Sequence, residues 1–138
     1  MIADLNTIPM VFSECNKKYF NHELKTPRFG VLHSFNTCAK FGCRRGTKNP
    51  KLATISVSDY YDYKKEEFES LMVHEMIHYY LAFTGKDTKV THGTEFMEMA
   101  ERLNNEYGLN VAKKVDASLF ERTENAPKYK GLMKFFFD

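Results

Sequence analysis

The chain has 138 residues, of which 43% are hydrophobic and 14% aromatic, so it is long enough for one domain with a real core and too short for two comfortable ones. Charged residues make up 28% and nearly balance, and a net charge of +2 excludes a global nucleic-acid signature. No apolar run reaches the ~18 residues of a membrane span. We expect a single domain over residues 1–138, with no membrane contact.

The first predicted element is an amphipathic helix that ends near Phe20. Apolar residues recur at steps of three and four between Leu5 and Phe20, which is the spacing of one helix face. Pro9 has no backbone N–H to donate, so the regular helix is predicted to begin near it.

Short β-rich pieces follow, over residues 29–35, 38–43 and 52–58. Turn-forming residues separate them, so we predict a small three-stranded antiparallel sheet in meander order. In the third piece apolar residues alternate with polar ones, and one face is therefore predicted to pack on the core. The apolar residues of that face are Ala53, Ile55 and Val57.

Two further helices are predicted, over residues 64–83 and 94–107, with Gly85 and Gly108 as their C-terminal caps. The tail, residues 126–138, is predicted to be a short strand or a packed extension. The fold class is therefore α+β, with an N-terminal helix, a small sheet and two later helices.

The stretch "VHEMIHYY" lies in the first of these two helices and contains His74, Glu75 and His78. Residues four apart lie about 40° from each other around a helix axis, so both imidazoles point toward one spot, with Glu75 about 100° from His74. In this geometry two histidines bind zinc and the glutamate holds a metal-bound water. The helix is apolar on nearly every other side, and burying three unpartnered polar groups would cost about 1–3 kcal/mol each. A metal removes that cost.

A catalytic zinc needs a third protein ligand, and three answers can be compared. A histidine after a glycine turn is disfavoured because Leu81 occupies the place of that glycine. Glu95 or Glu98 on the next helix would serve. We favour His92, because Gly93 beside it allows the backbone to turn sharply and aim the imidazole at the first two.

The other histidines and the cysteines are predicted to have ordinary roles. Three cysteines are an odd number and no secretory leader precedes them, so a reducing, cytoplasmic setting fits best. We expect buried or half-buried thiols that pack as small hydrophobes. The residues concerned are His22, His33, Cys15, Cys38 and Cys43.

"HEMIH" followed by "HGTEF" resembles the SprT-like metalloproteases, whose pattern is HExxH followed by HGxxF. Upstream, "YFNHELKTPRFGV" resembles the opening helix and first strand of that family, and "ATISVSDYY" resembles its last strand before the active-site helix. The resemblance covers roughly residues 15–110. It implies a zincin-like fold in which His74, His78 and His92 bind zinc and Glu75 is the general base. Many relatives add a cysteine-rich zinc ribbon, whereas this sequence has no cysteine after Cys43; it is either a minimal protease core or part of a longer chain.

In such a site zinc lowers the pKa of its water toward ~7 and polarises the scissile carbonyl, while Glu75 moves the proton to the leaving amine. We therefore predict peptide-bond hydrolysis. The candidates for an oxyanion stabiliser are Tyr79, Tyr80 and Tyr107, although tyrosines at such positions are more often core or rim residues.

A basic stretch suggests a partner. From Leu24 to Ser58 there is no Asp or Glu, and the proposed sheet should have one positively charged edge that tracks phosphates. SprT-like proteases include enzymes that digest proteins crosslinked to DNA, so the resemblance implies DNA-protein crosslink repair. The residues predicted to bind DNA are Lys40, Arg44, Arg45, Lys48 and Lys51.

Two alternatives remain open. The chain could be a nucleic-acid-binding module with a structural or vestigial zinc site, although such a site has no use for Glu75. It could also be a metal-dependent hydrolase of another bond, because HExxH sets the water chemistry and not the substrate. We expect either the loop over residues 84–91 or a further C-terminal part to control access to the site.

Overall fold

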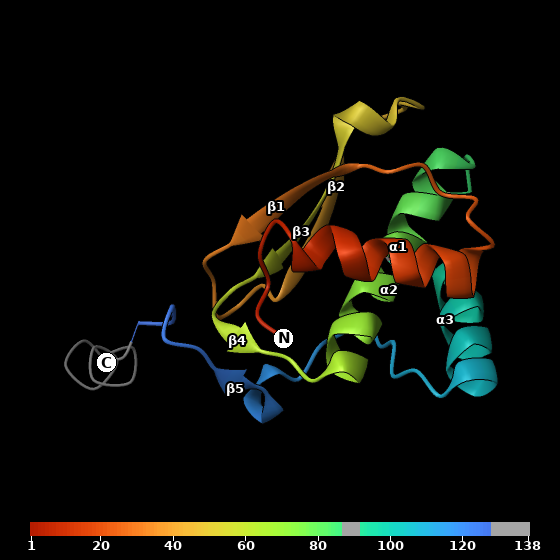
Figure 1. Cartoon of the computed structure of the whole chain (residues 1–138). Coiled ribbons are helices and arrows are strands. Elements are labelled where there is room, and N and C mark those ends of the chain that lie inside the picture. Colours follow the sequence, from red (N-terminus) through yellow and green to blue (C-terminus); the bar gives the residue numbers. More distant parts are fainter. Residues whose placement is uncertain (87–91, 128–138) are drawn as a thin grey trace.

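Helix α2 (Lys65–Phe83) lies at the centre of the structure, a computed structural model that describes residues 1–86 and 92–127. Helix α1 (Thr7–Phe20), helix α3 (Thr94–Tyr107) and a small sheet surround it (Figure 1). Its apolar residues are buried on nearly every side, so no single amphipathic stripe is present. The prediction of a central, largely buried helix is confirmed. The buried residues are Phe68, Leu71, Met72, Val73, His74, Glu75, Met76, Ile77, Tyr79 and Leu81.

The helix boundaries follow the local signals in the sequence. Pro9 lies in the first turn of α1, where its missing N–H costs nothing. At the end of α2, Gly85 has a φ of +72° and the Lys86 N–H donates to the Leu81 carbonyl at 3.0 Å. Gly108, with a φ of +71°, ends α3. Both glycines are left-handed caps, as predicted.

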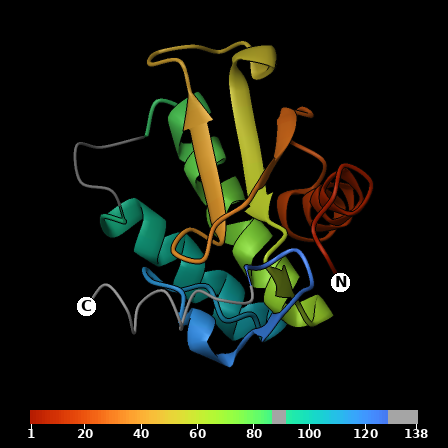
Figure 2. The ribbon, with the colours of Figure 1, turned by 90° about the vertical axis from the view of Figure 1, so that its left-hand side faces the viewer.

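The three-stranded sheet is mixed, so the predicted antiparallel meander is wrong. Strands β1 (Arg28–Leu32), β2 (Ala39–Cys43) and β3 (Ala53–Ser58) lie in the order β1-β3-β2. β1 pairs with β3 in parallel, and β2 pairs with β3 antiparallel. Figure 2 shows the sheet in front of α2. The inward face of β3 is fully buried, as predicted, through Ala53, Ile55 and Val57.

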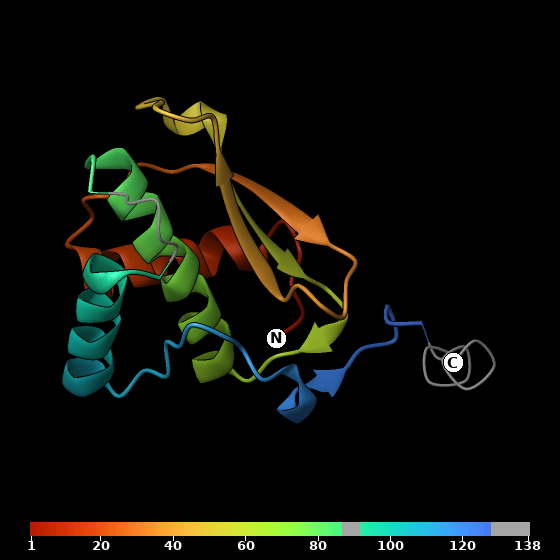
Figure 3. The ribbon, with the colours of Figure 1, turned by 180° about the vertical axis from the view of Figure 1, so that it is seen from behind.

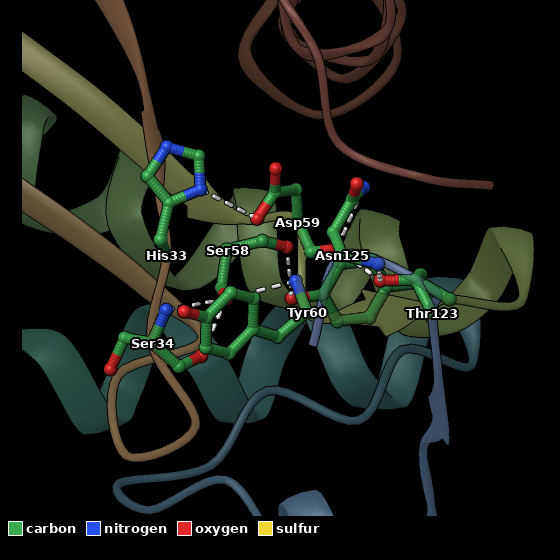
Figure 4. Close-up of polar contacts among 8 residues, drawn as sticks. His33, Ser34, Ser58, Asp59, Tyr60, Thr123 and Asn125 are labelled. Atoms are coloured by element: carbon green, nitrogen blue, oxygen red, sulfur yellow. Dashed lines mark hydrogen bonds and ion pairs between the residues drawn. The ribbon is translucent and has the colours of Figure 1, made fainter. Parts of the chain in front are cut away.

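The loop between β1 and β2 explains the unexpected strand order. It crosses the end of β3, and the buried Ser58 hydroxyl holds it there by donating to the Ser34 carbonyl at 2.5 Å (Figure 4). The same hydroxyl accepts from the Ser34 and Tyr60 N–H groups at 3.3 Å each. Neighbouring strands are ~4.8 Å apart, so a six-residue loop easily spans the two spacings from β1 to β2.

A second, two-stranded sheet ties the C-terminal part of the chain to the turn after β3. Its strands are β4 (Tyr61–Asp62) and β5 (Glu121–Arg122). Beside them the Thr123 hydroxyl donates to the Asp59 carbonyl at 2.5 Å (Figure 4). The remaining elements are the 3-10 helices η1 (Pro50–Leu52) and η2 (Ala117–Leu119).

Several other predictions can be compared with the described residues. Cys15 and Cys38 are buried and Cys43 is half-buried, as expected; burial raises the pKa of the Cys38 thiol to about 11. The described helices include none that is both long and apolar enough to cross a membrane. Most of the predicted C-terminal element, residues 128–138, lies outside the described residues, as do residues 87–91 of the suspected access loop.

We predict that Ser58→Ala destabilises the fold while Ser56→Ala does not. The first change removes a buried hydroxyl that serves three backbone groups, which should lower the free energy of unfolding by about 1–3 kcal/mol. Ser56 is half-exposed on the same strand, so its change should stay within about 0.5 kcal/mol. Urea unfolding measures both, and equal stabilities would show that the loop crossing does not depend on Ser58.

Candidate metal centre

Three histidine side chains from two elements converge at one point. His74 and His78 project from neighbouring turns of α2, and His92 immediately precedes the N-cap of α3. Their Nε2 atoms are separated by 3.3 Å (His74 to His78), 3.2 Å (His78 to His92) and 3.1 Å (His74 to His92). These nitrogens form a group that could hold a metal ion.

The spacing of these nitrogens fits a small tetrahedral ion. Ligand nitrogens about 2.0–2.1 Å from a tetrahedral zinc lie about 3.3–3.4 Å from one another, which is close to the observed separations. The Nδ1 of His74 lies 2.8 Å from the Ala112 carbonyl oxygen, which can only accept. Nδ1 therefore carries the hydrogen, and the Nε2 lone pair of His74 faces the other rings.

The environment keeps these rings neutral. Burial, together with the neighbouring histidines, lowers the pKa of His74 to about 4, and burial followed by His92 lowers that of His78 to about 4. The pKa of His92 is also lowered, first by burial and then by Lys113. At neutral pH each ring is thus uncharged and retains the lone pair that a metal needs.

The backbone at His92 has a strained conformation. His92 itself has a φ of +62°, whereas Gly93 has a φ of −75°, so the sharp turn expected at the glycine is made by the histidine. A left-handed conformation costs a residue with a Cβ roughly 1–2 kcal/mol. Such strain tends to persist where a side chain must be aimed at a functional site.

Phe96 lies against all three imidazoles. Its ring centroid is 4.9 Å from that of His74, 4.7 Å from that of His78 and 4.8 Å from that of His92. The ring is 1% exposed and comes from the first turn of α3. One aromatic ring therefore supports the whole histidine cluster from the core side. Phe96 is the last residue of the "HGTEF" stretch, and only the fold shows what its ring supports.

A short segment after α3 supplies the Ala112 carbonyl. The side-chain amide of Asn104 on α3 fixes this segment, because its Oδ1 accepts from the Val111 N–H at 2.8 Å and its Nδ2 donates to the Val111 carbonyl at 2.9 Å. The segment thereby fixes the ring orientation of His74. Sequence reasoning missed this support, because a backbone carbonyl has no residue signature.

Glu75 lies beside the histidines in a nearly dry environment. Glu75 is 7% exposed, and its Oε2 lies 3.9 Å from the His74 Nε2. Burial raises the pKa of its carboxyl to about 7, and a hydrogen bond from the Phe41 N–H partly opposes that rise. The carboxyl group can therefore both accept and release a proton near neutral pH.

A hollow of about 320 Å³ opens over the cluster. Strand β2 forms one wall of this hollow. Lys40, one of the residues in that wall, belongs to the basic stretch between Leu24 and Ser58. The lining residues of the hollow are Ala39, Lys40, Phe41, His74, Glu75, His78 and His92. The histidines and the carboxyl group therefore share one open space.

The alternative ligands and the tyrosines lie elsewhere. Glu95 and Glu98 line a separate hollow of about 370 Å³ between α1, α2 and α3, which Tyr80 also lines. Tyr79 is buried, with its hydroxyl donating to the Lys25 carbonyl at 2.8 Å. Tyr107 packs edge-on against a tyrosine of α1. No tyrosine is among the described residues that line the histidine hollow.

The remaining predicted residues have surface positions. His33 pairs with Asp59, Nδ1 to Oδ1 at 2.9 Å, at the end of the sheet (Figure 4). His22 follows α1 in a left-handed conformation. The Lys48 ammonium donates to the Phe83 carbonyl at 2.8 Å and so caps α2. Three further cations of the basic stretch are exposed: Arg44 and Arg45 directly after β2, and Lys51 on η1.

Comparison with known proteins identifies a family. The model of the SprT-like family matches residues 8–116, which is more than half of the 138-residue chain. No curated protein matches the sequence.

We predict that His92→Ala loses metal and that Glu95→Ala keeps it. Removing one of three converging nitrogens leaves two, whereas Glu95 lies in a different hollow. Elemental analysis of zinc in the purified proteins, at matched concentration, measures the outcome. Loss of zinc in Glu95→Ala with retention in His92→Ala would assign the third ligand to the glutamate.

We predict that Phe96→Leu weakens zinc binding about 10–100-fold, because groups that orient metal ligands have effects of that size. The chelator-competition affinity for zinc and the visible spectrum of the cobalt-substituted protein are the measurements. Leu103→Ala is the control, since Leu103 is also fully buried on α3 but lies about two helical turns beyond Phe96. Equal losses in both variants would reduce the role of Phe96 to general packing.

Proposed function

The chain belongs to the SprT-like family, and on that premise we propose that it is a zinc-dependent endopeptidase of zincin-like fold. His74, His78 and His92 would hold the ion, and Glu75 would act as general base. The observation that carries this proposal is the convergence of three neutral imidazoles next to a buried carboxyl group in one open hollow.

Zinc, when bound, would supply the Lewis acidity that makes water a better nucleophile and polarises a carbonyl. The residues of the chain do the rest. Glu75, with its pKa raised to about 7 by burial, accepts a proton from water and delivers it to the leaving amine. The Ala112 carbonyl keeps the His74 ring in the tautomer that presents Nε2. The Phe96 ring, packed against all three imidazoles, excludes water from the core side of the cluster.

A site with a base and an open face supports an enzyme over a structural zinc module. Structural zinc sites usually fill all four positions with protein ligands. Here three nitrogens converge, and the neighbouring carboxyl group is aimed at the same hollow without being one of them.

We further propose that substrates include proteins bound or crosslinked to DNA. The support is electrostatic: no acidic residue occurs between Leu24 and Ser58, and Lys40 lies both in this stretch and on the wall of the histidine hollow. Exposed cations that track phosphates bind DNA with strong salt dependence and little sequence preference. A protein held on such DNA would be brought close to the hollow.

We predict that Glu75→Gln keeps one zinc per chain and loses peptide hydrolysis by about 10²–10⁴-fold, the usual contribution of a general base. Glu101→Gln, an exposed change on α3, is the control and should leave the rate unchanged. The assay follows cleavage of unfolded casein, and of a histone with and without DNA, by the zinc-loaded full chain. Undiminished cleavage by Glu75→Gln would refute the proposed role, and absence of all cleavage with DNA binding intact would favour the nucleic-acid-binding module.

A further inference from the structure

A second hollow lies on the other side of His74. It has a volume of about 270 Å³, between the N-terminal half of α2 and the segment that follows α3. Figure 3 shows this segment crossing α2 on its way to β5. We name it the Leu71 hollow, and it is lined chiefly by Ser70, Leu71, His74, Val115, Leu119 and Phe120.

The Leu71 hollow and the histidine hollow share one wall. His74 lines both, and its Nε2 faces the other histidines while its Nδ1 faces the Ala112 carbonyl. Consecutive residues of an extended peptide are ~3.3–3.6 Å apart. A peptide with one carbonyl at the histidine cluster therefore has a neighbouring side chain within reach of the Leu71 hollow.

The chemistry of this hollow suits an apolar side chain. Its lining includes the buried Leu71 and the exposed Val115 and Leu119, which are 42% and 78% exposed. The volume of the hollow, about 270 Å³, is several times the ~30 Å³ that one water occupies in the liquid. The hollow therefore has room for a leucine- or phenylalanine-sized group. Charges lie on the rim, and carboxylates outnumber ammonium groups there: Glu66, Glu67, Asp116 and Lys114.

The walls are held in place before any ligand arrives. The Asn110 N–H donates to the Ser70 hydroxyl at 3.1 Å, which ties the segment to α2. The Asn104 amide ties Val111 to α3 through two hydrogen bonds. A preformed hollow binds a side chain without the entropy cost of ordering its walls.

We propose that the Leu71 hollow is a specificity pocket that receives an apolar side chain, of the size of Leu, Met or Phe, from a residue flanking the bond to be cut. This inference rests on the proposed peptidase function and adds a substrate preference to it. The acidic rim should also disfavour Asp and Glu in the neighbouring substrate positions.

The test uses two metal-binding probes on the zinc-loaded full chain, with affinities measured by calorimetry. Acetohydroxamic acid is too short to reach beyond the metal, and 4-methylpentanehydroxamic acid adds a branched apolar group. We expect the longer probe to bind at least about tenfold more tightly, because several methylene groups leave water. Val115→Asp should bring the ratio of the two affinities close to one. Leu52→Asp is the control, since Leu52 is 40% exposed and lies on η1, and it should keep the wild-type ratio within about twofold.

Each result decides between the two proposals. Equal affinities for both probes in the wild type, or loss of the ratio in Leu52→Asp as well, would overturn the pocket. Failure of both probes to bind would overturn the pocket and the open metal site together. A raised affinity for the longer probe without cleavage of any peptide would retain the pocket and reject the peptidase. Peptide cleavage with no preference for an apolar residue beside the cut bond would retain the peptidase and reject the pocket.

Discussion

The structure depends on keeping polar groups inside an apolar helix without leaving them charged or unpartnered. α2 is buried on nearly every side, yet it carries two histidines and a glutamate in its middle turns. Burial moves the pKa values of these groups in opposite directions, to about 4 for His74 and His78 and to about 7 for Glu75, so both types shift toward their neutral forms. The same neutrality gives the imidazoles free lone pairs and gives the carboxyl group a proton affinity suited to exchange with water.

The cluster is assembled from segments that are distant in sequence, each held by a different kind of contact. Packing places Phe96 of α3 under the rings, and a hydrogen-bond relay from Asn104 through Val111 brings the Ala112 carbonyl to His74. β2 closes the remaining side, where the Phe41 N–H reaches Glu75. The edge of the sheet, the central helix and the segment after α3 therefore meet at one site, and the mixed strand order is what brings β2 there.

The sequence predicts the helices and the pairing of His74 with His78 because both depend on local rules. Helical spacing places His74 and His78 together, and glycine caps end α2 and α3 where expected. Strand order could not be predicted in this way, since it rests on tertiary contacts such as the hydrogen bond from the buried Ser58 hydroxyl to the loop that crosses β3. The Ala112 carbonyl and the Leu71 hollow were also missed, because a backbone acceptor and an empty space are properties of the folded chain and not of a motif.

The left-handed conformation of His92 shows how binding and stability oppose each other in this site. Gly93, which could adopt that conformation without cost, is adjacent, yet the strain falls on the residue whose ring must face the cluster. A glycine at position 92 would relieve the backbone and remove a nitrogen from the cluster. An ion that binds only the folded chain stabilises it by an amount that grows with the logarithm of its concentration divided by its Kd. Occupation of the three nitrogens would therefore offset both this strain and the burial of the imidazoles. The conformation of His92 therefore costs stability in the chain without an ion, and a bound ion would recover that cost.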